Sequence, residues 1–128
     1  FPAEPDPTDR NSGICVLASA GEYDMLITGD MTEKTEQLLL ERENIPQTEL
    51  LVAGHHGAAG STGYALLSRL RPQTVLISVG EDNSYGHPSP QTLARIEAAG
   101  AAVYRTDQCG TITIRGPIYG KTNGTDPG

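Results

Sequence analysis

The segment Leu50-Leu51-Val52-Ala53-Gly54-His55-His56-Gly57 contains the pattern that decides the fold. Its four apolar residues show no polar alternation, which is typical of a strand buried on both faces of a sheet. Two imidazoles and a glycine follow at once, so chemically active side chains begin where the strand ends. Open α/β sheets bind ligands beyond the carboxyl ends of their strands. We therefore expect an α/β fold with functional residues in this loop.

Two other apolar runs of the chain end in the same way. Tyr23–Thr28 leads into a glycine and Asp30, and Val75–Val79 leads into a polar loop that contains His87. If these three strands are parallel neighbours, their carboxyl ends lie at one edge of the sheet. Because adjacent strands lie about 4.8 Å apart, we predict that Asp30, His87 and the histidine pair approach within roughly 10 Å of one another.

Helix signals alternate with these strands along the chain. The expected order is β-β-α-β-α-β-α-β-β, an α/β fold with a mixed sheet and helices packed on one face. The turn-forming residues 107–110 predict a hairpin between the last two strands. The expected strands are 13–20, 23–28, 50–53, 75–79, 102–105 and 111–115, and the expected helices are 32–43, 62–70 and 90–99. The expected N-caps are Asp30 (in a capping box with Glu33), Ser61 or Thr62, and Ser89 before Pro90.

The domain organisation predicts a piece of something larger. The chain has 128 residues and does not begin with Met. Residues 1–12 are rich in proline and acids and predict a linker or truncated loop, and residues 116–128 predict a flexible tail. Residues 13–115 then form the folded part. Its sheet needs a partner on the face that the helices leave open, because segment 50–53 is apolar on both sides.

Charge and hydropathy exclude two classes of protein. The formal net charge is −7, and an acidic chain is repelled by phosphate backbones, so it is not expected to bind DNA alone. No apolar run reaches the roughly 18 residues of a membrane-spanning helix, so this segment is expected to be soluble. Cys15 and Cys109 lack the spacing of a metal or redox motif and are expected to be free thiols.

Asp30 has two interpretations. At the rigid end of a strand and behind a glycine, its carboxylate is suited to bridge two metal ions of a hydrolase. Aspartate is also a preferred N-cap, and Asp30 could simply begin the next helix. The two roles are compatible because a carboxylate has two oxygens.

The three histidines also admit two interpretations each. His55 and His56 are poor core residues, and one could be a metal ligand while the other contacts the substrate or the ligand shell. His87 lies in a loop stiffened by two prolines just before a helix N-terminus, where backbone amides favour anions such as phosphate. Otherwise, the histidine pair is simply exposed, and His87 and Tyr85 only pack their loop.

In order and spacing these motifs resemble the C-terminal part of the metallo-β-lactamase-like domain of the bacterial competence (DNA-uptake) family ComEC. The similarity covers about residues 11–115. Thr-Gly-Asp alone is a weak signal, whereas the ordered set with Tyr-Gly-His-Pro is specific. The segments that carry the resemblance are Asn11-Ser12, Leu26–Asp30, His55–Gly57, Ile77–Gly80, Asn83 with Tyr85–Pro88, and Val103–Asp107.

The resemblance implies one half of an αββα sandwich, whose other half supplies an H-x-H-x-D-H metal cluster. Asp30 would then be the bridging metal ligand. The late histidine ligand would be His55 or His56, and His56 is favoured because it directly precedes the glycine. His87 would lie near the substrate phosphate, with His55 as the second catalytic candidate. Ala58 and Ala59 stand where the family often has a serine, and an alanine side chain cannot make the phosphate contact that a serine would make there.

Two functions follow as expectations from this resemblance. The first is a fragment of a metal-dependent phosphodiesterase or nuclease that uses Zn²⁺ or Mn²⁺ in the parent protein and acts on DNA. With only the late half of the site, the isolated chain is expected to be inactive. The second is a non-catalytic interaction or scaffolding module of the DNA-uptake machinery. The implied setting is an extracytoplasmic domain of an inner-membrane protein, with the upstream half of the same domain as its partner.

Overall fold

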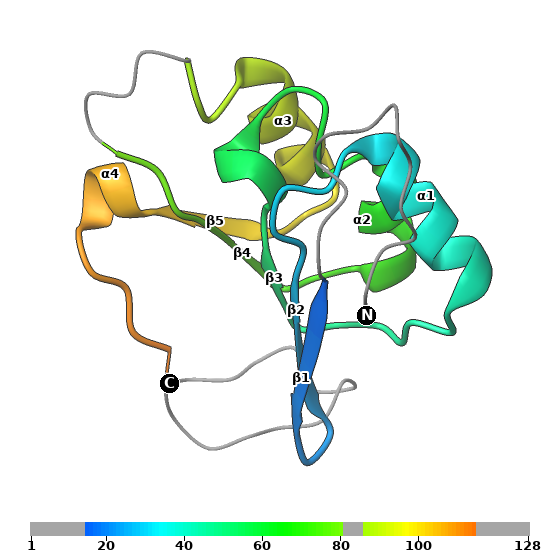
Figure 1. The fold of residues 1–128 in the computed structure, drawn as a ribbon. Helices are drawn as coiled ribbons and strands as arrows, with labels where there is room; N and C mark the ends of the chain where they lie inside the picture. The colour runs from blue at the N-terminus through cyan, green and yellow to red at the C-terminus, as the bar shows by residue number, and fades with distance from the viewer. Residues whose placement is uncertain (1–14, 81–85, 115–128) are drawn as a thin grey trace.

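The computed structural model describes residues 15–80 and 86–114. The predicted linker 1–12, the predicted tail 116–128 and the loop residues Asn83 and Tyr85 lie outside this part. The chain forms a five-stranded sheet with helices (Figure 1). Its elements are β1 (Val16–Ala20), β2 (Tyr23–Ile27), α1 (Glu33–Arg42), β3 (Leu50–Val52), a short turn η1 (Gly54–Gly57), α2 (Tyr64–Leu70), β4 (Thr74–Ile77), α3 (Pro90–Ala98), β5 (Ala102–Arg105) and α4 (Thr106–Cys109).

The sheet is mixed, as predicted. Its strands follow chain order, β1-β2-β3-β4-β5. β1 and β2 form an antiparallel hairpin, which turns at Gly21 with a φ of 62°. β2, β3, β4 and β5 are parallel neighbours, and Ile27 at the end of β2 lies opposite Val52 at the end of β3. The carboxyl ends of the first three of these strands therefore meet at one edge.

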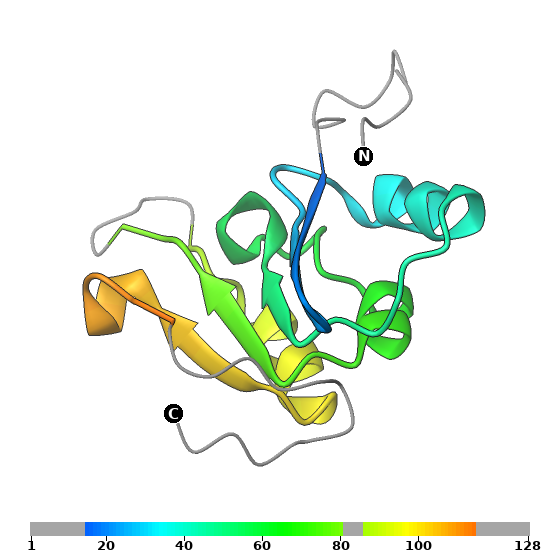
Figure 2. The same cartoon turned by 90° about the horizontal axis from the view of Figure 1, so that it is seen from below.

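Helices α1, α2 and α3 lie on one side of the sheet, which confirms the predicted α/β class (Figures 1 and 2). Each helix connects two parallel neighbours, and each crossover advances the sheet in the same direction. Right-handed crossovers of this kind place their helices on the same face. The core between sheet and helices is aliphatic; its fully buried members include Leu26, Leu51, Leu66, Leu70, Val75, Ile77 and Ile96.

The opposite face of the sheet carries an apolar row that no described helix covers. The strand register places one side chain from every strand in this row: Val16, Ile27, Val52, Leu76 and Tyr104. Val16 and Tyr104 are 44% and 45% exposed, and the three central residues are half-buried. This is the arrangement expected of one half of an αββα sandwich, in which two sheets pack face to face.

Two of the predicted helix N-caps are wrong. The N-cap of α1 is Thr32, whose hydroxyl accepts a 3.4 Å bond from the Thr35 N–H, so Asp30 does not cap this helix. The N-cap of α2 is Gly63, which has no side chain to cap it. Ser61 and Thr62 bond elsewhere, to Met31 and Gly54. The third prediction is confirmed, since Ser89 caps α3 and Pro90 is its first residue.

The predicted C-terminal hairpin is also wrong. Residues 107–109 of the expected turn belong to the short helix α4, and Gly110, with a φ of 68°, is the C-cap that follows it. A bidentate ion pair holds the beginning of this helix, with Arg105 Nε and Nη2 donating to the two Asp107 carboxylate oxygens at 2.9 and 2.6 Å. Residues 111–114 form no strand. Asp107 is therefore an ion-paired helix residue rather than a turn residue.

Both cysteines lie in the part of the chain that the structure describes, and no disulfide joins them. Cys15 is buried and Cys109 is exposed. Burial raises the pKa of the Cys15 thiol to about 11. Among the described residues, no helix is long and apolar enough to cross a membrane.

Candidate functional site

The histidine pair lies in a left-handed turn directly after β3. His55, His56 and Gly57 have φ angles of 49°, 55° and 80°. A positive φ costs a non-glycine residue on the order of 1 kcal/mol or more, and two such residues in succession are unusual. Strain of this kind persists only where the surroundings hold it and is concentrated at functional sites. The turn therefore marks this loop as a candidate site.

The turn that carries Asp30 lies against the histidine loop. The His55 N–H donates to the Gly29 carbonyl at 2.7 Å, and the Met31 N–H closes the Asp30 turn on the Thr28 carbonyl at 3.2 Å. A Cβ on Gly54 would lie 3.1 Å from the Thr28 hydroxyl and 3.4 Å from the Gly29 carbonyl. A side chain at position 54 would therefore require these neighbours to move by a few tenths of an ångström, and glycine allows the two loops to pack closely without this shift. Asp30 itself is exposed.

The loop that carries His87 lies against the other end of the same turn. The Ser89 N–H donates to the Gly57 carbonyl at 2.9 Å. A Cβ on Gly57 would lie 2.6 Å from the Pro88 Cβ, so this contact also requires glycine. Two physical causes therefore require a glycine at the end of the His-His-Gly motif: the positive φ of this residue and the close approach of the loop that contains Pro88.

The structure brings the predicted site residues together at one sheet edge. The ring centroid of His55 lies 6.4 Å from that of His56 and 5.5 Å from that of His87. Asp30 joins them through the turn bonded to the His55 backbone. The predicted approach within roughly 10 Å is thus confirmed for His55 with His56 and for His55 with His87, and the turn that contains Asp30 lies on the same edge. The metal-ligating and catalytic roles of these residues remain predictions.

Hydrogen bonding distinguishes the two nitrogens of His56. Its Nδ1 lies 2.6 Å from the carbonyl oxygen of Ser78, in the segment after β4. A carbonyl oxygen can only accept, so Nδ1 carries the proton and a neutral His56 presents the lone pair of Nε2. Metal-ligating histidines commonly have this arrangement. Partial burial, and then the neighbouring His55 and His56, hold the pKa of His87 below its ordinary value, which favours the neutral form of the His87 imidazole.

The imidazole and carboxylate groups at this edge are of the types that bind metal ions, but too few of them are grouped together. Imidazole nitrogen and carboxylate oxygen are ligands that Zn²⁺ accepts, and Mn²⁺ also favours carboxylate oxygen. Within residues 15–80 and 86–114, however, no three His, Cys, Asp or Glu side chains are grouped so that they could hold an ion. A metal ion at this edge would need ligands from beyond these residues.

Two charged residues that the sequence analysis missed support the loop after the histidines. The buried carboxylate of Glu36 in α1 accepts from the Thr62 N–H at 2.7 Å and from the Gly63 N–H at 2.9 Å. The Arg95 guanidinium in α3 donates to the carbonyls of Ala59, Ser61 and Thr62 at 2.8, 2.9 and 3.1 Å. Together they fix segment 58–63 between the two helices. The available sequence signal for Glu36 was its position three residues before the buried Leu39, because this spacing places both side chains on the same face of a helix.

Glu36 is expected to make stability depend on pH. Burial raises its pKa from 4.5 to about 7, against the opposing effect of its two N–H donors. The folded state therefore binds more protons than the unfolded state between these values. The stabilisation is fully present below the unfolded pKa and is lost as pH rises through about 7, and it is on the order of 3 kcal/mol.

Urea unfolding at several pH values from 5 to 8 measures this contribution. Glu36→Gln removes the titration, so its free energy of unfolding should fall less with rising pH than that of the wild type. Glu41→Gln, an exposed glutamate on the same helix, should retain the wild-type dependence. Identical pH dependence in all three proteins would contradict the assignment.

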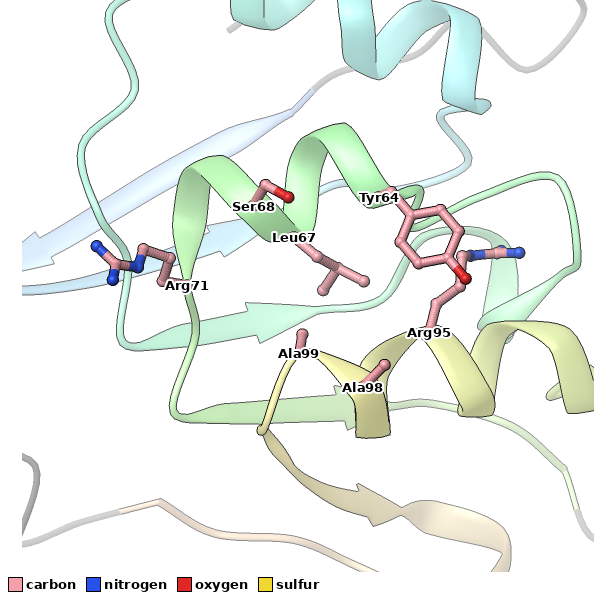
Figure 3. A pocket seen from close by; sticks show the side chains of 7 residues that line it. All are labelled: Tyr64, Leu67, Ser68, Arg71, Arg95, Ala98 and Ala99. Carbon is pink, nitrogen blue, oxygen red and sulfur yellow. The ribbon is translucent and has the colours of Figure 1, made fainter.

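A groove among the described residues lies away from this edge. It encloses about 380 Å³ between α2 and α3 and is lined by Tyr64, Leu67, Ser68, Arg71, Arg95, Ala98 and Ala99 (Figure 3). The Arg95 guanidinium carbon lies over the Tyr64 ring, 6.0 Å from the ring centroid. The Arg95 guanidinium is already bonded to segment 58–63. The groove contains none of the predicted site residues.

Three curated proteins are similar to this chain over most of its length. ComE operon protein 3 of Bacillus subtilis (strain 168) is 36% identical over 115 residues, which is 89% of this chain and 15% of that protein. Competence protein ComA of Neisseria gonorrhoeae is 34% identical over 87% of this chain and 16% of its own length. Recombination protein 2 of Haemophilus influenzae is 33% identical over 83% of this chain and 13% of its own length.

The chain therefore matches a small part of each of these proteins, about 15% of the length of the Bacillus protein. No protein-family model matches the chain. No solved structure matches it either.

Proposed function

We propose that this chain is the C-terminal part of a metallo-β-lactamase-like domain in a DNA-uptake protein of the ComEC family. The parent would be a metal-dependent phosphodiesterase or nuclease of the inner membrane, with this domain on the extracytoplasmic side. The observation that carries the proposal is the meeting of Asp30, His55, His56 and His87 at one sheet edge. The similarity to ComE operon protein 3 and to a protein named as a competence protein supports the setting.

Each residue has a role in this proposal that its surroundings support. Asp30 is the bridging ligand, since it is exposed and caps no helix. His56 is the second ligand through Nε2, because its Nδ1 is bonded to Ser78. His55 and His87 contact the phosphodiester. Bound Zn²⁺ or Mn²⁺ would supply an activated water and stabilise the developing charge on the phosphate.

The upstream half of the domain is the proposed source of the remaining ligands. Its place is the apolar row on the open sheet face, which extends across all five strands and ends in the exposed side chains of Val16 and Tyr104. A second sheet packed on this row would bury it, as in other two-sheet sandwiches. DNA would reach the site only in that completed domain, since this chain is itself acidic, with a net charge of −7.

The alternative is a non-catalytic interaction module of the uptake machinery. It is favoured by one observation, that the described residues hold no complete metal-ligand group of their own. In this case a partner would still pack against the apolar row, while the sheet edge that carries His55, His56 and His87 would bind no metal.

Activity distinguishes the two functions. We expect the 128-residue chain alone to show no substantial hydrolysis of a nitrophenyl phosphodiester with Zn²⁺ or Mn²⁺, because its ligand set is incomplete. The same chain preceded by the upstream half of its parent domain should hydrolyse it. Robust activity of the isolated chain that Asp30→Ala abolishes would contradict the half-site. An inactive extended chain would instead favour the interaction module.

A further inference from the structure

Thr106, which lies outside the histidine loops, is hydrogen-bonded to the segment whose Ser78 carbonyl is bonded to His56. Thr106 is the first residue of α4, which lies at the carboxyl end of β5 (Figure 1). Its hydroxyl accepts from the Val79 N–H at 2.8 Å and donates to the Val79 carbonyl at 2.9 Å. The Arg105–Asp107 ion pair spans Thr106 in sequence and holds the start of the helix. These bonds therefore fix the position of the Thr106 hydroxyl, which does not rotate freely.

The bond from Thr106 and the bond from His56 meet on one peptide group. The Val79 N–H and the Ser78 carbonyl belong to the same planar unit, in which the two groups point in opposite directions. Thr106 holds the N–H side, and His56 Nδ1 donates to the carbonyl side at 2.6 Å. The direction of the Ser78 carbonyl is thus set by Thr106. Bonds arranged in series in this way also polarise one another.

The protonation form of His56 depends on that carbonyl. A neutral imidazole in water exchanges its proton between the two nitrogens, and a fixed acceptor at Nδ1 selects one form. His56 is exposed, so no burial enforces the choice. Only the Nδ1-protonated form leaves Nε2 able to bind a metal ion or accept a proton.

We propose that Thr106 is a positioning residue for His56, which it keeps in the Nδ1-protonated form by holding the Ser78–Val79 peptide group in place. The use of Nε2 as a metal ligand rests on the proposed function. The protonation form itself does not, since it is a property of the metal-free chain.

NMR of the ¹⁵N-labelled, metal-free 128-residue chain tests this, at a pH where the imidazoles are neutral. The His56 spectrum should show a protonated Nδ1 and an unprotonated Nε2. In Thr106→Val both nitrogens should shift toward values averaged over the two forms. Exchange of the Val79 amide hydrogen should become faster by about tenfold, because its acceptor is gone.

Two control variants separate positioning from general stability. Thr106→Ser keeps the hydroxyl and should restore both wild-type signals. Thr111→Val alters an exposed threonine just beyond α4 and should leave both unchanged. Thr106→Ala is the second test variant, should Thr106→Val fail to fold.

Either of two results would overturn the proposal. One is a wild-type His56 protonated at Nε2. The other is an unchanged His56 form in a folded Thr106 variant whose Val79 amide exchanges faster. Neither result depends on phosphodiesterase activity, so the proposal and the proposed function can fail separately.

Discussion

Replacing Gly57 with alanine is expected to lower the free energy of unfolding by about 3 kcal/mol. Two effects add. The residue has a φ of +80°, which costs an alanine on the order of 1 kcal/mol. The new Cβ would also lie 2.6 Å from the Pro88 Cβ and 3.0 Å from its Cα, a contact with rigid ring and backbone that cannot move aside cheaply. The His87 loop should shift away from His55 as a result.

Gly100→Ala is the matched control for this variant. Its φ is +82°, nearly that of Gly57, yet no atom lies within 4 Å of the added Cβ. Its expected cost is therefore only the conformational part, about 1 kcal/mol. Urea unfolding of both variants measures the difference. Equal losses would contradict the claim that the His-His-Gly glycine is required by the proline loop.

In the proposed hydrolase, which is this chain joined to the upstream half of its domain, Asp30→Ala is expected to reduce phosphodiester hydrolysis by about 10³-fold. Loss of a bridging ligand disrupts both ions of a two-metal site, and stabilisation by such ions is worth several kcal/mol of the barrier. Folding should be unaffected, because Asp30 is exposed and α1 is capped by Thr32.

The control for Asp30 is Glu41→Ala, which removes an exposed acid from α1. It should retain wild-type activity and stability. Steady-state rates together with urea unfolding separate a lost ligand from a damaged fold. Wild-type activity in Asp30→Ala would show that Asp30 is not part of the active site. A variant that unfolds far more easily would instead make Asp30 a structural residue.

The parts of the fold that depend on local patterns were predictable. Apolar runs placed every strand from β1 to β5, and Ser89 with Pro90 placed the start of α3. Strand-end positions also indicated where Asp30 and the histidines would meet, because parallel strands share an edge.

The errors arose where neighbouring residues have similar chemistry. Asp30 and Thr32 are both good N-cap residues and lie only two positions apart. Because Thr32 caps α1, Asp30 is not used as the cap and lies at the candidate site instead. The segment Asp107–Gly110 contains residues suited to a turn, yet α4 forms there because the ion pair with Arg105 and the Thr106 bonds to Val79 hold it. Val79, like the two N–H partners of Glu36, lies far away in the sequence, outside any local window.

Mn²⁺ titration of the ¹⁵N-labelled chain, followed by paramagnetic broadening of its amide signals, tests the half-site directly. We expect the first signals to broaden to be those of the three loops at the carboxyl edge, residues 29–31, 54–57, 86, 87 and 89, and we expect Asp30→Ala to abolish this pattern. Broadening is expected even for weak binding, so an incomplete ligand set does not prevent detection. Broadening centred on the acidic surface of α1, or unchanged by Asp30→Ala, would contradict the account.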